Sequence, residues 1–191
     1  KLKTIDAAGG PTATLGDGAL GATGAWSMDD VILFTPSGES PLYRVSAAGG
    51  TSSRVTTLDA ASGDSQHTYP VFLPDSQHFL YLVQGSKSGG VFEPRGVYVG
   101  SLDPREPSKQ LLQSGFNAKY AQGHLVFLRD NTLMAQALDL GRLEMRGEAR
   151  ALVEKTQTAS GGGSGAAAAF TVSETCVVRY PTAAASLRAG L

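Results

Sequence analysis

The fold is decided by residues 68–112, whose first part reads Thr-Tyr-Pro-Val-Phe-Leu-Pro-Asp-Ser-Gln-His-Phe-Leu-Tyr-Leu-Val (68–83). A polar loop follows, then Gly-Val-Tyr-Val-Gly-Ser-Leu (96–102), a Pro-containing turn, and Lys-Gln-Leu-Leu (109–112). Four short apolar runs separated by turn residues are typical of antiparallel strands. Pro-Asp-Ser (74–76) predicts an Asx-type turn, because an Asp side chain can accept hydrogen bonds from nearby backbone N–H groups. The segment therefore predicts a four-stranded antiparallel unit.

The same unit recurs along the chain. With the full unit taken as residues 68–113, looser copies occupy residues 24–58 and 117–154. The copies are marked by aromatic residues spaced 46, 48 and 50 residues apart, namely Trp26, Phe72, Tyr120 and Phe170. A period in this range is typical of propeller and solenoid arrays, in which each sheet buries its faces against its neighbours. The sequence thus predicts an all-β protein, a β-propeller with blades of four antiparallel strands.

Both ends of the chain hold half of a unit. Residues 1–16 match the third and fourth strands, because their Ala-Ala-Gly-Gly turn recurs at residues 47–50. Residues 168–181 match the first two strands. We therefore predict three full blades and two half-blades in one domain, residues 1–181. Either the half-blades pair into a fourth blade, or the chain, which starts in mid-blade and without Met, is a fragment of a six-bladed or larger ring.

Composition and charge limit the function classes. With 41% hydrophobic and 17% charged residues the chain is globular, and 24 glycines and nine prolines suit a turn-rich β protein. A net charge of −1 argues against nucleic-acid binding, and no apolar run reaches the length of a membrane span. We therefore predict that this segment contacts neither nucleic acid nor a membrane. Cys176 is the only cysteine, which excludes an intrachain disulfide. Its place in an alternating run predicts that it is a small residue within a strand.

Two polar loops predict the binding surface. Residues 58–68 link one blade to the next, and residues 84–95 join the second and third strands within a blade. Each antiparallel strand reverses the direction of the last, so both loops should emerge on the same face. Recognition concentrates in long loops on a rigid scaffold. The candidate binding residues on this face are Asp59, Asp64, His67, Lys87, Glu93 and Arg95.

Other segments carry structural expectations. Trp26 has a large apolar surface, which predicts a packing anchor between neighbouring blades. Residues 140–153 contain two glycines and occupy a fourth-strand position, so we expect a turn followed by a strand. Residues 155–169 are rich in Gly, Ala and Ser, as in a flexible linker, and the tail at 182–191 has no period and should be poorly ordered.

Two serines could be taken for nucleophiles. Ser65 lies in Gly-Asp-Ser with His67 two residues away, but a serine hydrolase needs its Ser on a strained turn and its His held by a third group. Ser164 lies in Gly-Gly-Ser-Gly-Ala, which lacks the last glycine of the Gly-x-Ser-x-Gly elbow and follows no strand. We predict no catalytic residue.

Metal and cofactor sites are not predicted either. No two of His67, His78 and His124 have the spacing that places zinc ligands on one element. His78 and His124 both precede the second strand of their copies, which predicts a repeated structural position. The acidic residues near turns form no dense calcium loop and are better explained as Asx caps.

Two segments resemble the Trp-Ser-Pro-Asp-Gly hallmark of WD40-like PD40 repeats, the repeats of TolB-type β-propellers: Trp-Ser-Met-Asp-Asp (26–30) and Phe-Leu-Pro-Asp-Ser (72–76). Met28 and Asp30 replace Pro and Gly in the first segment, and Ser76 replaces Gly in the second. The wider pattern looks like the propeller that follows the kinase domain in some bacterial Ser/Thr kinases. Its other parts are residues 42–50, 78–81, 97–103 and 131–136.

The resemblance covers Leu2 to Tyr180 and implies an extracytoplasmic, periplasmic sensor or interaction propeller that binds a protein or a small molecule. It transfers no catalytic residue. We therefore expect a non-catalytic binding scaffold. The alternative is a propeller-based hydrolase, of esterase or glycosidase type, with a loop-borne nucleophile. A third class is assembly, in which two chains complete each other's half-blades as a homodimer, because an unpaired sheet edge is a template for another strand.

Overall fold

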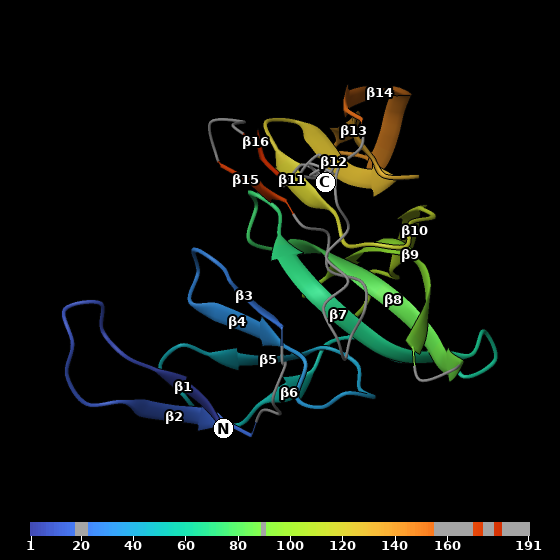
Figure 1. Cartoon of the computed structure of the whole chain (residues 1–191). Coiled ribbons are helices and arrows are strands. Elements are labelled where there is room, and N and C mark those ends of the chain that lie inside the picture. The colour runs from blue at the N-terminus through green and yellow to red at the C-terminus, as the bar shows by residue number, and fades with distance from the viewer. Residues whose placement is uncertain (18–22, 89–90, 155–169, 174–177, 181–191) are drawn as a thin grey trace, which may run out of the picture.

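The computed structural model describes residues 1–17, 23–88, 91–154, 170–173 and 178–180, and all regular structure in these ranges is β-strand (Figure 1). No helix capable of crossing a membrane occurs in the described ranges. The strands are β1 (Leu2–Thr4), β2 (Ala13–Gly16), β3 (Gly24–Trp26), β4 (Val31–Phe34), β5 (Tyr43–Ser46), β6 (Ser53–Arg54), β7 (Asp64–Phe72), β8 (His78–Ser88), β9 (Val91–Ser101), β10 (Lys109–Leu112), β11 (Lys119–Ala121), β12 (His124–Arg129), β13 (Thr132–Asp139), β14 (Glu144–Val153), β15 (Thr171–Val172) and β16 (Val178–Arg179).

The described strands form three four-stranded antiparallel sheets. Sheet 1 contains β3 to β6, sheet 2 contains β7 to β10, and sheet 3 contains β11 to β14. In each sheet every strand pairs with the next strand along the chain, and the sheets follow one another in sequence order (Figure 1). The prediction of an all-β chain with three such units is confirmed.

The pairing register shows that the units are structural repeats. In each sheet the aromatic landmark lies opposite the second residue of the following strand: Trp26 opposite Ile32, Phe72 opposite Phe79, and Tyr120 opposite Leu125. His78 and His124 are the first residues of β8 and β12, so the two histidines do occupy equivalent positions. The sequence alignment of these units is therefore the structural alignment as well.

Two shorter sheets flank the array. β1 and β2 form one two-stranded sheet beside sheet 1, and β15 and β16 form another beside sheet 3 (Figure 1). The β1–β2 turn copies the β5–β6 turn: Gly9 N donates to Asp6 O and Gly49 N to Ser46 O, both at 2.9 Å. Each turn continues through a second glycine of positive φ. The β1–β2 turn thus matches the turn between the third and fourth strands of sheet 1, and the described strands close no ring.

The cores lie between consecutive sheets. Side chains alternate along β8, so Leu80 and Leu82 pack toward sheet 3, whereas Phe79, Tyr81 and Val83 pack toward sheet 1. Sheet 2 is therefore buried on both faces, which explains why its strands read as nearly continuous apolar runs. The sheet 3 partners in the first of these cores are Ala118, Leu125, Phe127 and Leu138.

The Asx turn and the fourth strand of sheet 3 agree with prediction. Asp75 Oδ1 accepts hydrogen bonds from the backbone N–H of Gln77 at 3.0 Å and of His78 at 2.9 Å. Residues 140–143 form a turn and β14 follows. The predicted linker at residues 155–169 and the predicted tail at 182–191 lie outside the described residues, as does Cys176.

The prediction that Trp26 anchors neighbouring units is wrong. Its side chain is 57% exposed, and its Nε1 donates a hydrogen bond to Asp30 Oδ1 at 3.2 Å. Because side chains alternate along β3 and Ala25 takes the more buried side, Trp26 points outward and lies over the following turn.

The boundaries of the two polar loops are also wrong. β6 ends at Arg54 and β7 begins at Asp64, so residues 55–63 link sheet 1 to sheet 2, and only residues 58–63 of the predicted loop lie outside a strand. β8 continues to Ser88 and β9 begins at Val91, so most of residues 84–95 is an extension of the hairpin. Polar composition was the misleading signal, because these backbone groups pair with each other whatever side chains they carry.

Candidate functional site

The predicted binding residues converge at one end of sheet 2. Asp64, at the start of β7, pairs with Gly85 near the end of β8, so the two polar segments do emerge on the same face. Asp59, Asp64, His67 and Arg95 lie within one contact network. Glu93 is exposed on β9 and joins no contact of this network. The backbone of Lys87 pairs with Phe92 farther along the hairpin, and its side chain is outside the described atoms.

Asp59 organises the turn that precedes β7. Its carboxylate accepts hydrogen bonds from the Ser62 hydroxyl and from the backbone N–H of Ala61, the latter at 3.0 Å. The bond from Ser62 is the main reason that the pKa of Asp59 lies below its usual value. Asp59 therefore acts as a turn cap that fixes the position of Asp64.

His67 is a buried neutral base behind Asp64. Its Nδ1 lies 2.8 Å from Thr56 Oγ1, which already accepts a hydrogen bond from Leu42 N at 2.9 Å. The Thr56 hydroxyl can therefore donate to Nδ1, which leaves the proton on Nε2, 3.7 Å from Asp64 Oδ2. Burial lowers the pKa of His67 to about 4, despite the opposing effect of Asp64. His67 is thus uncharged at neutral pH.

Arg95 extends from β9 across the start of β7. Its Nε lies 3.7 Å from Asp64 Oδ1. A Cβ atom on Gly63 would lie 2.8 Å from Arg95 Nη2, and one on Gly85 would lie 2.9 Å from Nε. Both distances are shorter than van der Waals contact, so the guanidinium lies on a surface that only two glycines leave open. Gly63 also has a φ of +72°, which favours glycine.

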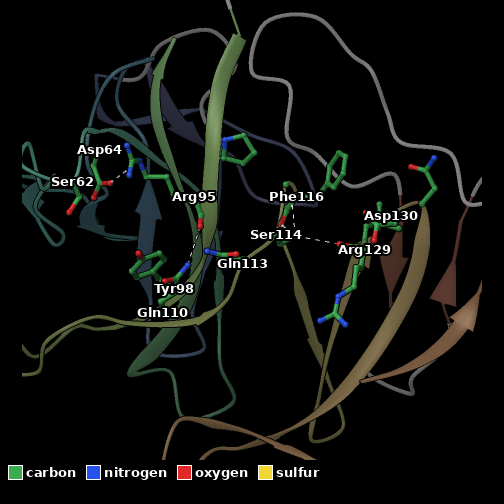
Figure 2. Close-up of a pocket in the computed structure, with 14 residues that line it drawn as sticks. Ser62, Asp64, Arg95, Tyr98, Gln110, Gln113, Ser114, Phe116, Arg129 and Asp130 are labelled. Carbon is green, nitrogen blue, oxygen red and sulfur yellow. Dashed lines mark hydrogen bonds and ion pairs between the residues drawn. The ribbon is translucent and has the colours of Figure 1, made fainter. Parts of the chain in front are cut away.

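Asp64 and Arg95 line one wall of a groove of about 830 Å³ between the ends of sheets 2 and 3 (Figure 2). Asp64 and Arg95 lie on one side, Arg129 and Asp130 on the other, and Ser114 between them (Figure 2). The volume is within the range of small-molecule and peptide-side-chain sites. The lining residues are Ser62, Asp64, Pro94, Arg95, Tyr98, Gln110, Gln113, Ser114, Gly115, Phe116, Leu128, Arg129, Asp130 and Asn131.

Hydrogen bonds and ring contacts hold the walls of the groove. Gln110 Nε2 donates to Arg95 O at 3.0 Å, which joins β10 to the start of β9. Ser114 Oγ donates to Phe116 O at 2.8 Å and accepts from Phe116 N at 3.1 Å, which closes a tight turn in the link to sheet 3. The Arg129 guanidinium lies 5.4 Å from the centre of the Phe127 ring, a cation–π contact.

Sequence reasoning missed the half of the groove that sheet 3 contributes. Asp130 and Asn131 form a two-residue turn with positive φ at both positions, between the paired residues Arg129 and Thr132. This turn joins the second and third strands of its unit, so it is the repeat equivalent of the loop that supplied Arg95. The repeat itself therefore contained the signal that would have found Arg129.

The two serines considered as nucleophiles have different outcomes. Ser65 Oγ donates to the carbonyl of Gly85 at 2.5 Å, and the nitrogens of His67 face Thr56 and Asp64 instead. This arrangement gives Ser65 no base. Ser164 lies outside the described residues. Over the part of the chain that the structure covers, no three His, Cys, Asp or Glu side chains are grouped to hold a metal ion.

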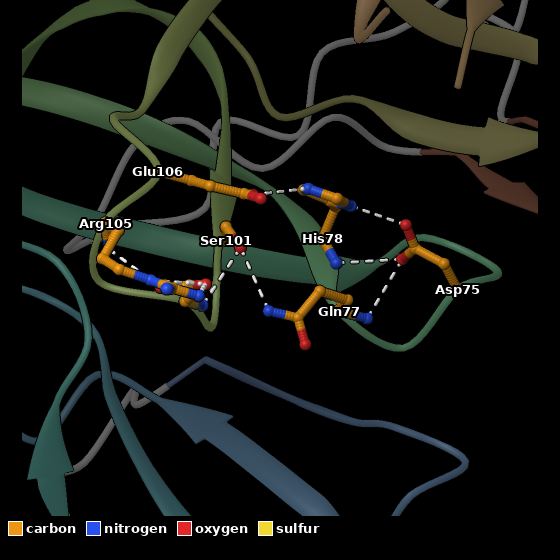
Figure 3. Close-up of polar contacts among 7 residues, drawn as sticks. Asp75, Gln77, His78, Ser101, Arg105 and Glu106 are labelled. Atoms are coloured by element: carbon orange, nitrogen blue, oxygen red, sulfur yellow. Dashed lines mark hydrogen bonds and ion pairs between the residues drawn. The ribbon is translucent and has the colours of Figure 1, made fainter. Parts of the chain in front are cut away.

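A second polar cluster surrounds His78 at the opposite end of sheet 2 (Figure 3). His78 Nδ1 lies 2.6 Å from Asp75 Oδ2 and His78 Nε2 lies 2.9 Å from Glu106 Oε2. Gln77 Nε2 donates to Ser101 Oγ at 3.1 Å (Figure 3). Both partners of the imidazole are carboxylates, so both ring nitrogens donate, as in the protonated form. The cluster joins the β7–β8 turn to the β9–β10 loop.

Replacing His78 with Gln is expected to flatten the pH dependence of stability. Burial lowers the pKa of His78, but the hydrogen bonds with Asp75 and Glu106 outweigh it and raise the pKa above 6.5. The stabilisation is therefore complete below about pH 6.5 and is lost as pH rises through the raised pKa. Urea unfolding at about pH 6 and about pH 9 should show a smaller difference for His78→Gln than for the unmodified chain.

His124→Gln is the matched control, because His124 Nδ1 contacts only the carbonyl of Gln122 at 3.0 Å. This variant should keep the pH dependence of the unmodified chain. The same change in unfolding free energy between the two pH values in all three proteins would show that the His78 cluster contributes nothing to the pH dependence of stability.

Comparison of the chain with protein-family models, with curated proteins and with solved structures finds no match in any of the three.

Proposed function

We propose that this chain is a non-catalytic binding module, a β-propeller segment that receives a ligand in the groove between sheets 2 and 3. The observation that carries the proposal is the groove itself, about 830 Å³, with charged, amide, hydroxyl and aromatic side chains from two sheets. Polar groups that converge on a concave surface can fix the orientation of a bound ligand. The loops of one face supply it, and paired strands of sheets 2 and 3 lie behind them.

The radial arrangement is supported by how the sheets pack. At two of the junctions the first strand of one sheet contacts the first strand of the next, β3 against β7 and β11 against β15. Sheet 2 packs on sheet 1 through one face and on sheet 3 through the other. In a propeller the innermost strands of successive blades approach each other in the same way. The resemblance to PD40 repeats adds the expectation of an extracytoplasmic setting, as a sensor or interaction domain.

A groove-filling variant tests the proposal. Gln113 is exposed in the groove, so Gln113→Trp should place an indole ring there and abolish binding. Met28→Trp is the control, because Met28 is exposed on the β3–β4 turn of sheet 1 and does not line the groove. Both variants would be screened by thermal shift and by ¹⁵N NMR against peptides, oligosaccharides and small esters. Ligands should bind the unmodified chain and Met28→Trp, and should not bind Gln113→Trp.

Two results would overturn the proposal. One is a set of ligands that bind Gln113→Trp as well as they bind the unmodified chain, since the groove would then not be the site. The other is turnover of an ester or glycoside that is lost in Ser65→Ala, since that would make the chain a hydrolase.

A further inference from the structure

Arg95 is a cation whose hydrogen-bonding capacity is unused among the described residues. Its side chain is 40% exposed in the groove, and the nearest carboxylate oxygen, Asp64 Oδ1, is 3.7 Å from Nε. Among the described residues no acceptor lies within hydrogen-bond distance of its guanidinium. The group lies against the backbone at Gly63 and Gly85, which limits the positions that it can take. A guanidinium that is already positioned loses little freedom when it pairs with a planar anion such as a carboxylate.

Asp64 does not occupy this capacity. Its side chain is only 12% exposed, and its Oδ2 faces inward, 3.7 Å from His67 Nε2 and 3.4 Å from the backbone N–H of Asp59. The carboxylate therefore compensates the charge of Arg95 from behind, while the guanidinium remains accessible from the groove. A ligand that approaches from solvent meets the cation first.

The rest of the groove indicates what accompanies the anion. Arg129 on the opposite wall adds a second guanidinium, and Asp130 beside it is the exposed carboxylate of the site. Pro94, which is exposed, and Phe116, which is half-buried, add apolar surface next to these charges. A free anion or an acidic sugar would leave that apolar surface uncovered, whereas a peptide can place apolar side chains beside an acidic one.

We propose that the groove binds an acidic peptide segment, whose Asp or Glu carboxylate pairs with Arg95 while neighbouring apolar side chains cover Pro94 and Phe116. This inference rests on the proposed binding function and names its ligand class. Because the chain has a net charge of only −1, no strong overall field assists or opposes an acidic peptide. The pairing is therefore local and should weaken as salt concentration rises.

The test is selection of random heptapeptides displayed on phage against the full chain, followed by affinity measurement with the synthetic peptides. The enriched peptides should contain Asp or Glu beside apolar residues. Changing that residue to its amide should weaken binding about tenfold, as should Arg95→Gln. The two changes together should cost little more than either alone, because both remove the same contact. Arg105→Gln, which removes an exposed arginine paired with Asp103, should leave the affinity unchanged.

Gly85→Ala separates the position of Arg95 from its charge. Its Cβ would displace the guanidinium from its present place, so peptide affinity should fall while the melting temperature stays close to that of the unmodified chain. Arg95→Lys keeps the positive charge but loses the planar guanidinium that can donate two parallel hydrogen bonds. This variant should bind the peptides more weakly than the unmodified chain and more tightly than Arg95→Gln.

Three outcomes would overturn the inference: enriched peptides without an acidic residue, affinities unchanged by Arg95→Gln, or binding of glutarate or oligogalacturonate with no peptide selected. In each case the proposed function stands if Gln113→Trp abolishes the binding that is found. If the selected peptides bind Gln113→Trp equally well, the groove is not the site and the proposed function fails with the inference.

Discussion

Phe127→Ala is expected to lower the free energy of unfolding by about 3–5 kcal/mol. Phe127 lies in the middle of β12, is 0% exposed, and belongs to the core between sheets 2 and 3. Its removal leaves a cavity among Leu82, Val97 and Leu125 that the paired strands cannot close. It also removes the ring on which the Arg129 guanidinium lies, so the wall of the groove should loosen as well.

Urea unfolding followed by far-ultraviolet circular dichroism would measure this effect. Ile5→Ala is the control, because Ile5 is 60% exposed and its truncation should change stability by less than about 0.5 kcal/mol. Equal stability losses for Phe127→Ala and Ile5→Ala would show that sheets 2 and 3 do not share a core in solution.

Gln84→Met is expected to raise the free energy of unfolding by about 1–3 kcal/mol. Gln84 is 0% exposed, and neither its Nε2 nor its Oε1 has a hydrogen-bond partner among the described residues. No described protein group replaces the hydrogen bonds that this amide makes to water in the unfolded chain. Met has a similar length and no such requirement, and its flexible side chain can fill the same space.

Gln136→Met provides the comparison. Gln136 Nε2 donates to Gly147 O at 2.7 Å, so its replacement should give no increase in stability. Both variants would be measured by the same urea titration. A loss of stability in Gln84→Met would mean that the Gln84 amide has a bonding partner in solution.

The sheets were predictable because their signals are local. Each unit contains its apolar runs, its Asx or glycine turn and its aromatic landmark within about 50 residues, and antiparallel neighbours need no information from elsewhere. The errors fall where local signals mislead. Gln66, His67 and Thr68 read as a polar loop, yet all three are buried in β7. Trp26 reads as core, yet the neighbouring Ala25 takes the inward side.

Half of the candidate site was predictable for the same reason. Asp64 and Arg95 were expected on one face because strand direction alone fixes which loops share a face. The contributions of Ser114, Phe116 and Arg129 depend on how sheet 3 packs against sheet 2. No pattern within a single unit encodes the relative position of two sheets. Applying the repeat alignment to the Asp130–Asn131 turn would have recovered part of it.

Every strand in the described sheets takes its hydrogen bonds from a chain neighbour, so no sheet is interleaved with another. Genetic duplication or loss of one block of 46 to 48 residues would therefore add or remove a complete sheet and leave the pairing of all others intact. The number of sheets can therefore change by recombination while the hydrogen bonds within every other sheet are kept.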